Sequence, residues 1–245
     1  MRYLIGVDDT DNLESRGTGF RARTLGRLLT EAGIGELKGV SRHQLFVHDD
    51  IAYTSHNSAL CLDVQVAEDR ADELHGFCRS FLIRESAPGS DAGLCITPWE
   101  EVPDAIMEFG RAAKSTVLAR RQAEALAAGE GVLLEGLTGD HGGVIGALAC
   151  VGLRRAGHDG RFVWLKGVRE LSGAARASEL LETTGIEVIR SLQGQGVDGD
   201  SLVRVDPWPR PVLLEGRAVL LVERPEDPDV EHDWQLLPRE VIRGY

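Results

Sequence analysis

The sequence predicts a mixed α/β (α+β) fold. Strand-like runs with alternating apolar residues, helices with apolar residues three and four apart, and glycine-rich loops between the two kinds of element occur along the whole chain. At 245 residues the chain can bury one large core or two modest ones. Its hydrophobic share of 42% and charged share of 27% are ordinary for a soluble globular protein.

The first predicted element is a short strand, Tyr3–Val7, which runs directly into three carboxylates, Asp8, Asp9 and Asp11. Carboxylates at the end of a strand can hold Mg²⁺, a cation that prefers oxygen ligands and keeps waters and substrate phosphates at its other positions. The competing interpretation is that Asp8–Asn12 is an Asx-rich turn that caps the following helix.

The chain then passes through Gly17, Thr18 and Gly19 into a helix expected over Phe20–Ala32, which Gly33 ends. Backbone N–H groups at the start of such a helix can bind phosphate oxygens. The Thr18 hydroxyl could cap the helix, bind a metal or phosphate, or act as a nucleophile, and capping asks only for local geometry. The order of strand, acidic turn, glycine loop and helix is typical of a site for a metal and a nucleotide.

Two strands are expected next, Leu37–Val47 and Ser58–Val66, joined by the polar connection His48–Asn57. A helix over Glu68–Ile83 and a short strand over Gly93–Thr97 follow. This β–β–α–β order is compatible with a ferredoxin-like unit.

A long helix is expected over Pro98–Ala128, with Gly129 ending it, and a strand over Gly131–Glu135 comes after it. The glycine-rich loop Gly136–Gly143 then opens an apolar helix that starts at Val144. A loop of this kind between a strand and a helix can bind an anion, and an ordinary tight turn is the alternative. The loop has neither the Walker pattern nor the dinucleotide-binding glycine spacing.

The C-terminal part is expected to hold further α/β elements that complete the sheets, with an acidic tail, Glu223–Tyr245, lying over the surface. Glu215–Arg217 is expected to form either a bulge or a turn in the last strand region. The other elements expected here are the strands Arg161–Leu165, Glu187–Leu192, Leu202–Val205 and Pro211–Val222 and the helix Ala174–Thr184.

Charge and cysteine usage limit the classes of partner. The net charge of −12 opposes binding to a polyanion, so nucleic acid is not favoured, although a local basic patch stays compatible with it. The densest early basic cluster is best explained as a solvated helix face: Arg16, Arg21, Arg23 and Arg27. The four cysteines form no C-x-x-C pair and indicate reduced core residues rather than a zinc site: Cys61, Cys78, Cys95 and Cys150.

No apolar run approaches the roughly 20 residues of a membrane span, and the N-terminus begins with a strand rather than a signal peptide. We therefore expect a cytoplasmic protein without a membrane partner.

Four stretches occur in a fixed order: GVDDTDN (Gly6–Asn12), DDIAYTSHNSALCLDV (Asp49–Val64), SAPGSDAGLCI (Ser86–Ile96) and GDHGGVIGALACVGL (Gly139–Leu153). Together they resemble motifs of the archaeal tRNA(isoleucine) agmatinylcytidine synthetase family. In that family an ATP-dependent kinase-like domain, paired with a ferredoxin-like domain, phosphorylates the carbonyl of a tRNA cytosine, and agmatine then displaces the phosphate.

The resemblance implies a kinase-like region over residues 1–170, with ferredoxin-like elements around 41–97, either consecutive or interleaved, and C-terminal elements over 171–245. It implies ATP and Mg²⁺ as cofactors, with Thr18 matching the family's phosphorylated threonine. The metal and the triphosphate would be held by the carboxylates Asp8, Asp9 and Asp11. The phosphate-facing loops would be shaped by Gly17, Gly19, Gly139, Gly142 and Gly143.

This sequence also departs from the family. It leaves no room for the family's OB-fold and has no cysteine pairs for its zinc ribbon. Glycine stands near Gly142–Gly143 where the family has an arginine, so the positive charge that phosphoryl transfer needs must come from elsewhere. The sequence does not choose among Arg16, Arg21, Lys166 and Arg169 for this role.

We therefore predict an ATP- and Mg²⁺-dependent phosphotransferase or ligase-like enzyme that activates an amide or carbonyl oxygen of a small-molecule acceptor. The alternatives are a nucleotide-binding regulatory protein without turnover and a tRNA cytidine-modification subunit that needs a partner. A homodimer is compatible with each of them. The spacing of His43, His48 and His56 matches no metal-ligand pattern, although His56 lies in a matched motif and His141 in the glycine loop, so either could touch substrate.

Overall fold

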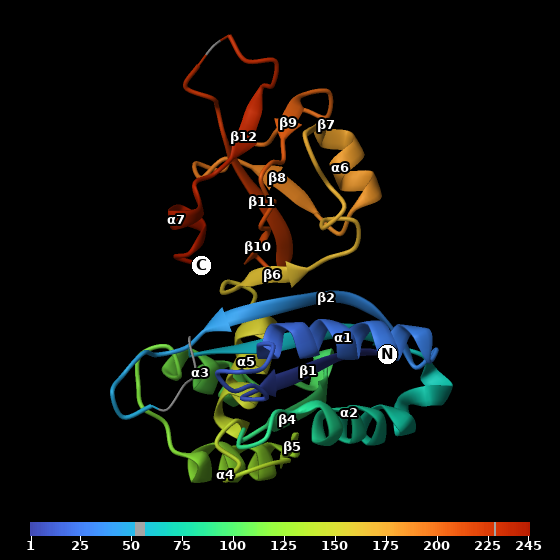
Figure 1. Cartoon of the computed structure of the whole chain (residues 1–245), viewed down its shortest axis with the longest axis vertical. Coiled ribbons are helices and arrows are strands. Elements are labelled where there is room, and N and C mark those ends of the chain that lie inside the picture. Colours follow the sequence, from blue (N-terminus) through green and yellow to red (C-terminus); the bar gives the residue numbers. More distant parts are fainter. Residues whose placement is uncertain (52–56, 228) are drawn as a thin grey trace. The chain divides into compact units, whose positions relative to one another are not determined.

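The computed structural model describes residues 1–51, 57–227 and 229–245. The chain divides into two compact units, Met1–Ala156 and Gly157–Tyr245 (Figure 1). Both units combine sheet and helix, which confirms the mixed α/β fold that the sequence predicts. The sequence places the domain boundary between residues 170 and 171, whereas the first compact unit ends at Ala156, the last residue of a helix that begins at Val144.

The first unit contains a five-stranded antiparallel sheet with the strand order β5-β4-β1-β3-β2. Strand β1 lies in its middle, and Ile5 pairs with Leu62 of β3 on one side and Ile96 of β4 on the other. The strands are β1 (Arg2–Asp8), β2 (Gly35–Gln44), β3 (Ser58–Val66), β4 (Gly93–Pro98) and β5 (Leu133–Gly136).

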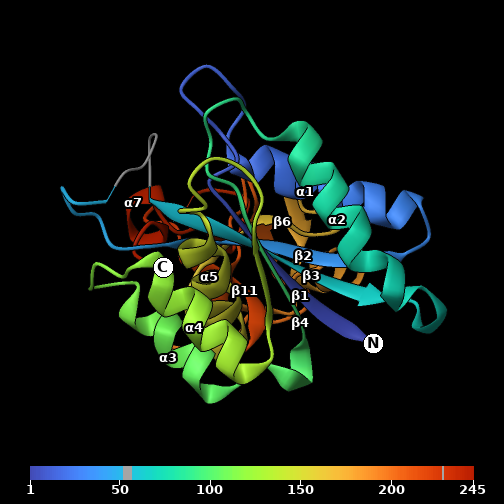
Figure 2. The ribbon, with the colours of Figure 1, turned by 90° about the horizontal axis from the view of Figure 1, so that it is seen from below.

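Helices cover both faces of this sheet (Figure 2). The first face carries α1 (Thr18–Glu31) and α2 (Ala71–Glu85), the latter preceded by a 3₁₀ turn, η1 (Glu68–Arg70). The second face carries α3 (Asp104–Ala112), α4 (Arg120–Glu130) and α5 (Val144–Ala156). The main core of this unit lies between these three helices and the sheet.

Helix α5 packs unusually close to strand β1. A β-carbon built on Gly6 would lie 2.9 Å from the carbonyl carbon of Ala147 and 3.0 Å from Cys150 Sγ. Real β-carbons do not approach backbone this closely, so a glycine at position 6 allows the helix to rest on the strand. This close packing fixes the start of α5 next to the end of β1.

The long helix that the sequence predicts over Pro98–Ala128 is not present as one element. Pro98 ends β4, a 3₁₀ turn η2 (Trp99–Glu101) follows, and α3 and α4 are separated by residues 113–119. The run Ser115, Thr116 and Val117 has low helix propensity and lies in this break. Helix α4 does not end at Gly129, as the sequence predicts. Its C-cap is Gly131, whose φ of 70° suits a left-handed C-cap.

The second unit has the strand order β6-β10-β11-β12-β9-β7, and β8 pairs in parallel with β11. Glu215 and Gly216, with φ of 53° and 75°, form the turn between β10 and β11, which is one of the two alternatives expected from the sequence. Its elements are β6 (Arg161–Trp164), β7 (Ala174–Arg176), α6 (Ala177–Thr183), β8 (Val188–Arg190), β9 (Leu202–Arg204), β10 (Val212–Leu214), β11 (Arg217–Glu223), β12 (Trp234–Leu236) and α7 (Arg239–Ile242).

Two predictions for the second unit are corrected. The helix expected over Ala174–Thr184 begins only at Ala177, because β7 pairs with β9 and this pairing overrides helix propensity. The tail does not simply lie over the surface, since β12 pairs with β11 and β9 and Trp234 is only 2% exposed. In the part of the chain that the structure describes, no helix is both long enough and apolar enough to cross a membrane.

Candidate functional site

The acidic turn begins at the last residue of β1. Burial raises the pKa of Asp8 well above its usual value, and repulsion from Asp9 and Asp11 raises it further, while a backbone hydrogen bond from Asp9 opposes the rise. Burial also raises the pKa of Asp9 to about 6, with repulsion from Asp91, Asp11 and Asp140 adding to the shift. Asp9 therefore lies within electrostatic range of acidic groups from three segments, namely Asp8 and Asp11 in its own turn, Asp91 and Asp140.

Asp91, in the segment before β4, holds the second glycine loop in place. Its Oδ1 accepts a hydrogen bond from the Asp140 N–H at 2.7 Å, and its carbonyl oxygen accepts one from the Gly143 N–H at 2.8 Å. A β-carbon on Gly139 would lie 2.9 Å from Asp91 Cγ, so this loop position requires a glycine, which also suits its φ of 57°.

The glycine loop and the acidic turn are in contact. A β-carbon built on Gly146, in the first turn of α5, would lie 2.6 Å from Asp8 Cγ, and one on Gly143 would lie 2.9 Å from the Asp8 carbonyl oxygen. The Asp8 carboxylate thus rests against the N-terminal turn of α5, where the helix dipole favours negative charge. Segments more than 130 residues apart in sequence form one site.

Four consecutive backbone N–H groups of the second glycine loop, from Asp140 to Gly143, are already hydrogen-bonded within the chain. Asp140 Oδ1 accepts from Gly142, and the Thr138 carbonyl accepts from His141. With the two bonds to Asp91, the N–H groups of all four residues from Asp140 to Gly143 have intrachain acceptors. In this conformation Gly139, Gly142 and Gly143 shape the loop and pack it against the acidic turn, but the amides of Gly142 and Gly143 already have acceptors.

Thr18 is the first residue of α1 and links the acidic turn to that helix. Its hydroxyl donates to Asp11 Oδ1 at 2.7 Å and accepts from the Thr10 N–H at 3.2 Å and the Thr10 hydroxyl at 3.0 Å. Gly17 occupies the N-cap and makes no side-chain capping bond. The capping interpretation of Thr18 is therefore wrong, because its hydroxyl is used by Asp11 and Thr10.

The Asx turn is formed by Asn12 rather than by the three aspartates. Asn12 Oδ1 accepts from the Glu14 N–H at 3.1 Å, and the Asn12 N–H donates to Ser15 Oγ at 3.0 Å. Asp9 has a φ of 50°, a conformation that costs energy for residues other than glycine. The turn is therefore closed by neighbouring residues, and Asp8 and Asp9 are not needed to close it.

The sequence does not identify Arg42 of β2, which lies within electrostatic range of Asp11. Its Nε donates to Ser58 Oγ at 2.8 Å, and burial lowers its pKa while Asp11 opposes that change. Arg42 pairs with Leu60 of β3, and Leu60 Cδ1 lies 3.9 Å from a β-carbon built on Gly19. Arg42 therefore lies on the sheet face covered by α1, near the first turn of that helix.

Three of the four cations that the sequence proposes make contacts with other groups. The Arg16 guanidinium lies 4.3 Å from the centre of the Phe20 ring, and Arg21 donates to the carbonyl oxygens of Glu85 and Arg16. Lys166 and Arg169 belong to the second unit, where Arg169 stacks on the Trp208 ring at 4.8 Å. Among the described residues, the two cations of the first unit, Arg16 and Arg21, are held by contacts with groups other than the three aspartates.

A metal ion would fit the acidic turn only with help from other ligands. Among the residues that the structure describes, no group of three or more His, Cys, Asp or Glu side chains is arranged to hold a metal by itself. Mg²⁺ is usually held by one or two carboxylates together with waters and substrate phosphates. The mutual repulsion of Asp8 and Asp9 is the feature that a divalent cation would relieve.

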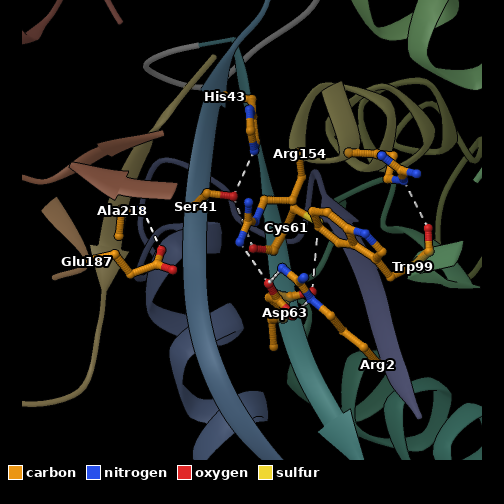
Figure 3. Close-up of polar contacts among 11 residues, drawn as sticks. Arg2, Ser41, His43, Cys61, Asp63, Trp99, Arg154, Glu187 and Ala218 are labelled. Carbon is orange, nitrogen blue, oxygen red and sulfur yellow. Dashed lines mark hydrogen bonds and ion pairs between the residues drawn. The ribbon is translucent and has the colours of Figure 1, made fainter. Parts of the chain in front are cut away.

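His43, His48 and His141 differ in burial. His43 is fully buried and its Nε2 lies 2.8 Å from Ser41 Oγ (Figure 3). His48 is exposed beside Asp50, and His141 is exposed in the glycine loop with a φ of 70°. The matched-motif positions Thr54, Ser55 and His56 lie outside the described residues.

A second polar cluster lies apart from the acidic turn. Asp63, which is 2% exposed, accepts from Arg2 at 2.9 and 2.6 Å and from Arg154 at 2.7 Å (Figure 3). The Arg2 guanidinium stacks 3.5 Å from the centre of the Trp99 ring, and Arg155 donates to the Trp99 carbonyl oxygen. These contacts join the start of β1 to the end of α5 and indicate a structural role.

A cavity of about 330 Å³ also lies away from the acidic turn. It is found at the opposite end of β1, since Tyr3 lines it and Asp8 does not. Its walls include Tyr3, Leu74, His75, Ile96, Glu101 and Glu130.

No protein-family model matches the sequence, and no curated protein matches it at a significant level. Solved structures do match. A tRNA fluorescent labeling enzyme has a TM-score of 0.54 at 24% identity over 62% of this chain and 36% of its own. TiaS, an agmatidine synthetase that acts on an isoleucine tRNA, gives 0.53 at 23% over 62% and 35% in its apo form. TiaS in complex with this tRNA and ATP gives 0.54 at 24% over 62% and 36%.

These similarities show a shared fold. Over 62% of its length the chain has the fold of part of TiaS. It spans about 36% of the length of the structures that it matches.

Proposed function

We propose that this protein is an ATP- and Mg²⁺-dependent phosphotransferase or ligase-like enzyme that activates an amide or carbonyl oxygen of a small-molecule acceptor. The observation that carries the proposal is the contact between the Asp8 carboxylate and the first turn of α5 at Gly146. It brings the acidic turn and the second glycine loop into one site. The similarity in fold to a complex of TiaS with ATP supports the same assignment.

Asp8 and Asp9 would hold Mg²⁺, with Asp11 beside them. The ion would neutralise the charge on the phosphates and orient the terminal phosphoryl group. The raised pKa values of Asp8 and Asp9 support this role, because two carboxylates that repel each other in a partly buried turn are stabilised by a bound cation.

The phosphates would face the start of α1 rather than the second glycine loop. The first N–H groups of a helix generally have no acceptor within the helix, although the Phe20 N–H of α1 donates to the Gly17 carbonyl oxygen at 2.9 Å. Asp11 Oδ2 and Arg23 Nη1 each lie 3.7 Å from a β-carbon built on Gly17 and on Gly19, respectively, so both side chains border the approach to these N–H groups. The amides from Asp140 to Gly143 are already used within the chain. Gly139, Gly142 and Gly143 would then support the site by holding the loop against Asp8.

Thr18 would be the protein's own phosphoryl acceptor. Its hydroxyl donates to Asp11 Oδ1, so Asp11 is placed to take the proton as the Thr18 oxygen bonds to phosphorus and the bond to the leaving diphosphate breaks. Incubation with ATP followed by mass spectrometry tests this role. A phosphate on Thr18 supports it, and an unmodified threonine after complete ATP binding contradicts it.

The strand order β4-β1-β3-β2, with α1 and α2 as the two connections, supports a ferredoxin-like unit within the first part of the chain. This unit would contribute the acidic turn, while β5, the glycine loop and α5 would complete the site beside it.

A tRNA-modification subunit is the second candidate, because a TiaS complex that contains its tRNA has the same partial fold. The net charge of −12 counts against direct RNA binding. Titration of ATP with and without Mg²⁺ tests the first proposal, and absence of saturable, metal-dependent binding contradicts it. Activity on small amides or amines distinguishes it from the second candidate, which predicts turnover only with tRNA and a partner.

A further inference from the structure

The proposed nucleotide site contains an excess of negative charge. Asp8, Asp9, Asp11, Asp91 and Asp140 gather around it, and a polyphosphate adds several more negative charges. A divalent ion between Asp8 and Asp9 neutralises only part of this charge. At least one fixed cation is therefore required on the side of the phosphates that faces away from the metal.

Most of the basic side chains near the turn already have other contacts. Arg16 lies over the Phe20 ring, and Arg21 donates to two backbone carbonyl oxygens. Arg120, at the start of α4, donates to the Asp140 carbonyl and pairs with Glu124 at 3.4 Å. These contacts hold the three side chains to exposed parts of the surface.

Arg42 differs from them in its position. It lies on β2, and its strand partner Leu60 approaches Gly19 of α1. The bond from Nε to Ser58 Oγ fixes the plane of its guanidinium, so the conformational entropy of the side chain is largely lost before any ligand binds.

Arg42 also lies in a position where an unpaired positive charge is unfavourable, because the side chain is partly removed from water. It is partly buried, and burial lowers its pKa. Asp11 opposes this change through electrostatic attraction, while Asp11 Oδ1 accepts the Thr18 hydroxyl. Positive charge kept partly out of water beside a cluster of acids suits an incoming anion that would pair with it directly.

We infer that Arg42 binds the phosphate chain of the nucleotide, held in its orientation by Ser58, on the sheet face near the first turn of α1. This inference rests on the proposed function. A guanidinium can donate two parallel hydrogen bonds to a phosphate, which the ammonium of lysine cannot reproduce.

The test is the affinity for Mg·ATP, measured by isothermal titration calorimetry on the full chain, for wild type, Arg42→Gln, Arg42→Lys and Ser58→Ala. Arg27→Gln is the matched control, because Arg27 is exposed on α1 and pairs with Glu31. We expect Arg42→Gln to weaken binding about tenfold or more, Arg42→Lys and Ser58→Ala to weaken it less, and Arg27→Gln to leave it unchanged. Inorganic tripolyphosphate should compete with ATP for wild type and compete poorly for Arg42→Gln.

Two results overturn the inference, and they differ. If wild type binds Mg·ATP and Arg42→Gln binds it equally well, the inference fails and the proposed function stands. If wild type does not bind Mg·ATP at all, both fail. Circular dichroism monitors folding of each variant, and Arg42→Lys and Ser58→Ala supply the answer if Arg42→Gln does not fold, because unchanged affinity in both would contradict a phosphate-binding arginine.

Discussion

Gly146 presents its bare α-carbon to the Asp8 carboxylate, and a β-carbon there would lie 2.6 Å from Asp8 Cγ. This relationship joins the end of β1 to the start of α5. It explains why a glycine stands inside the first turn of an apolar helix, where it would otherwise cost about 1 kcal/mol relative to alanine.

We therefore expect Gly146→Ala to displace the Asp8 carboxylate. It should lower the free energy of unfolding by about 1–3 kcal/mol and weaken Mg·ATP binding about tenfold or more. Gly129→Ala is the control, since a β-carbon on Gly129 of α4 meets nothing within 4 Å and should stabilise by about 0.5–1 kcal/mol. Urea unfolding and calorimetry measure both effects, and equal behaviour of the two variants would contradict the packing argument.

The Asp9 carboxylate is expected to lower the stability of the metal-free protein at neutral pH while it contributes to metal-dependent ATP binding. Its pKa of about 6 exceeds the usual 3.8, so the folded protein binds more protons than the unfolded chain between these pH values. The contribution of Asp9 to stability is therefore greatest below about pH 4 and falls as the pH rises through 6. In the absence of metal at pH 7.5, Asp9→Asn should have a free energy of unfolding roughly 1–3 kcal/mol greater than wild type and should therefore unfold at a higher temperature. This gain should vanish near pH 4.

The same substitution should remove metal-dependent ATP binding, because the neutral amide is a weaker ligand for Mg²⁺. Thermal melts from pH 4 to 8 with EDTA measure the first effect, and calorimetry measures the second. A destabilised Asp9→Asn protein at pH 7.5 would show that the carboxylate serves the fold rather than a ligand.

Position 18 should tolerate serine, which keeps the hydroxyl group, but not valine, which lacks it. Thr18→Ser keeps the bonds to Asp11 and Thr10, whereas Thr18→Val leaves those buried polar groups without this partner at a cost of about 1–3 kcal/mol. After incubation with ATP, mass spectrometry should find phosphate on the threonine of wild type and on the serine of Thr18→Ser. Phosphate at another residue in Thr18→Val, at the wild-type level, would contradict the acceptor role.

Substitution of Asp63 should lower the free energy of unfolding without changing the affinity for Mg·ATP. Asp63→Asn leaves Arg154 with much less compensation in a buried position and should cost about 3–5 kcal/mol. Because the Arg2–Asp63–Arg154 cluster lies near the start of β1, Mg·ATP affinity at temperatures where the variant is folded should equal that of wild type. A selective loss of affinity in fully folded Asp63→Asn would place this cluster in the binding site instead.

The fold was predictable where local pattern decides it. Strand β3 has the bounds Ser58–Val66 that its alternation predicts, and α1 begins two residues before the predicted Phe20. The break between α3 and α4 and the strand β7 were missed, because the first depends on weak helix formers after Ala112 and the second on pairing with β9.

The site was predictable only in part. The order of strand, acids and glycine loop was predicted correctly, because this order is local, but Asp8 is the last residue of β1 and Thr18 the first residue of α1, whereas the sequence placed them in the turn and in the glycine loop. Arg42 was missed, since a bulge between Leu37 and Gly39 shifts the alternation of β2 and hides which face Arg42 occupies.

Asp91 was also missed, because its role as the anchor of the glycine loop depends on contacts about 50 residues along the chain. The same contacts explain why the loop amides, which the sequence assigns to phosphate, are used within the protein. The sequence pattern identifies a tight loop, but it does not tell which acceptors its N–H groups find.

The central claim is that carboxylates at the end of β1 bind a nucleotide through a divalent ion. Calorimetric titration of ATP into wild type and Asp8→Asn, each with Mg²⁺ and with EDTA, tests it most directly. We predict saturable binding to wild type that requires Mg²⁺ and is lost in a folded Asp8→Asn protein. Equal binding to both proteins, or no binding to wild type in either buffer, would contradict the claim.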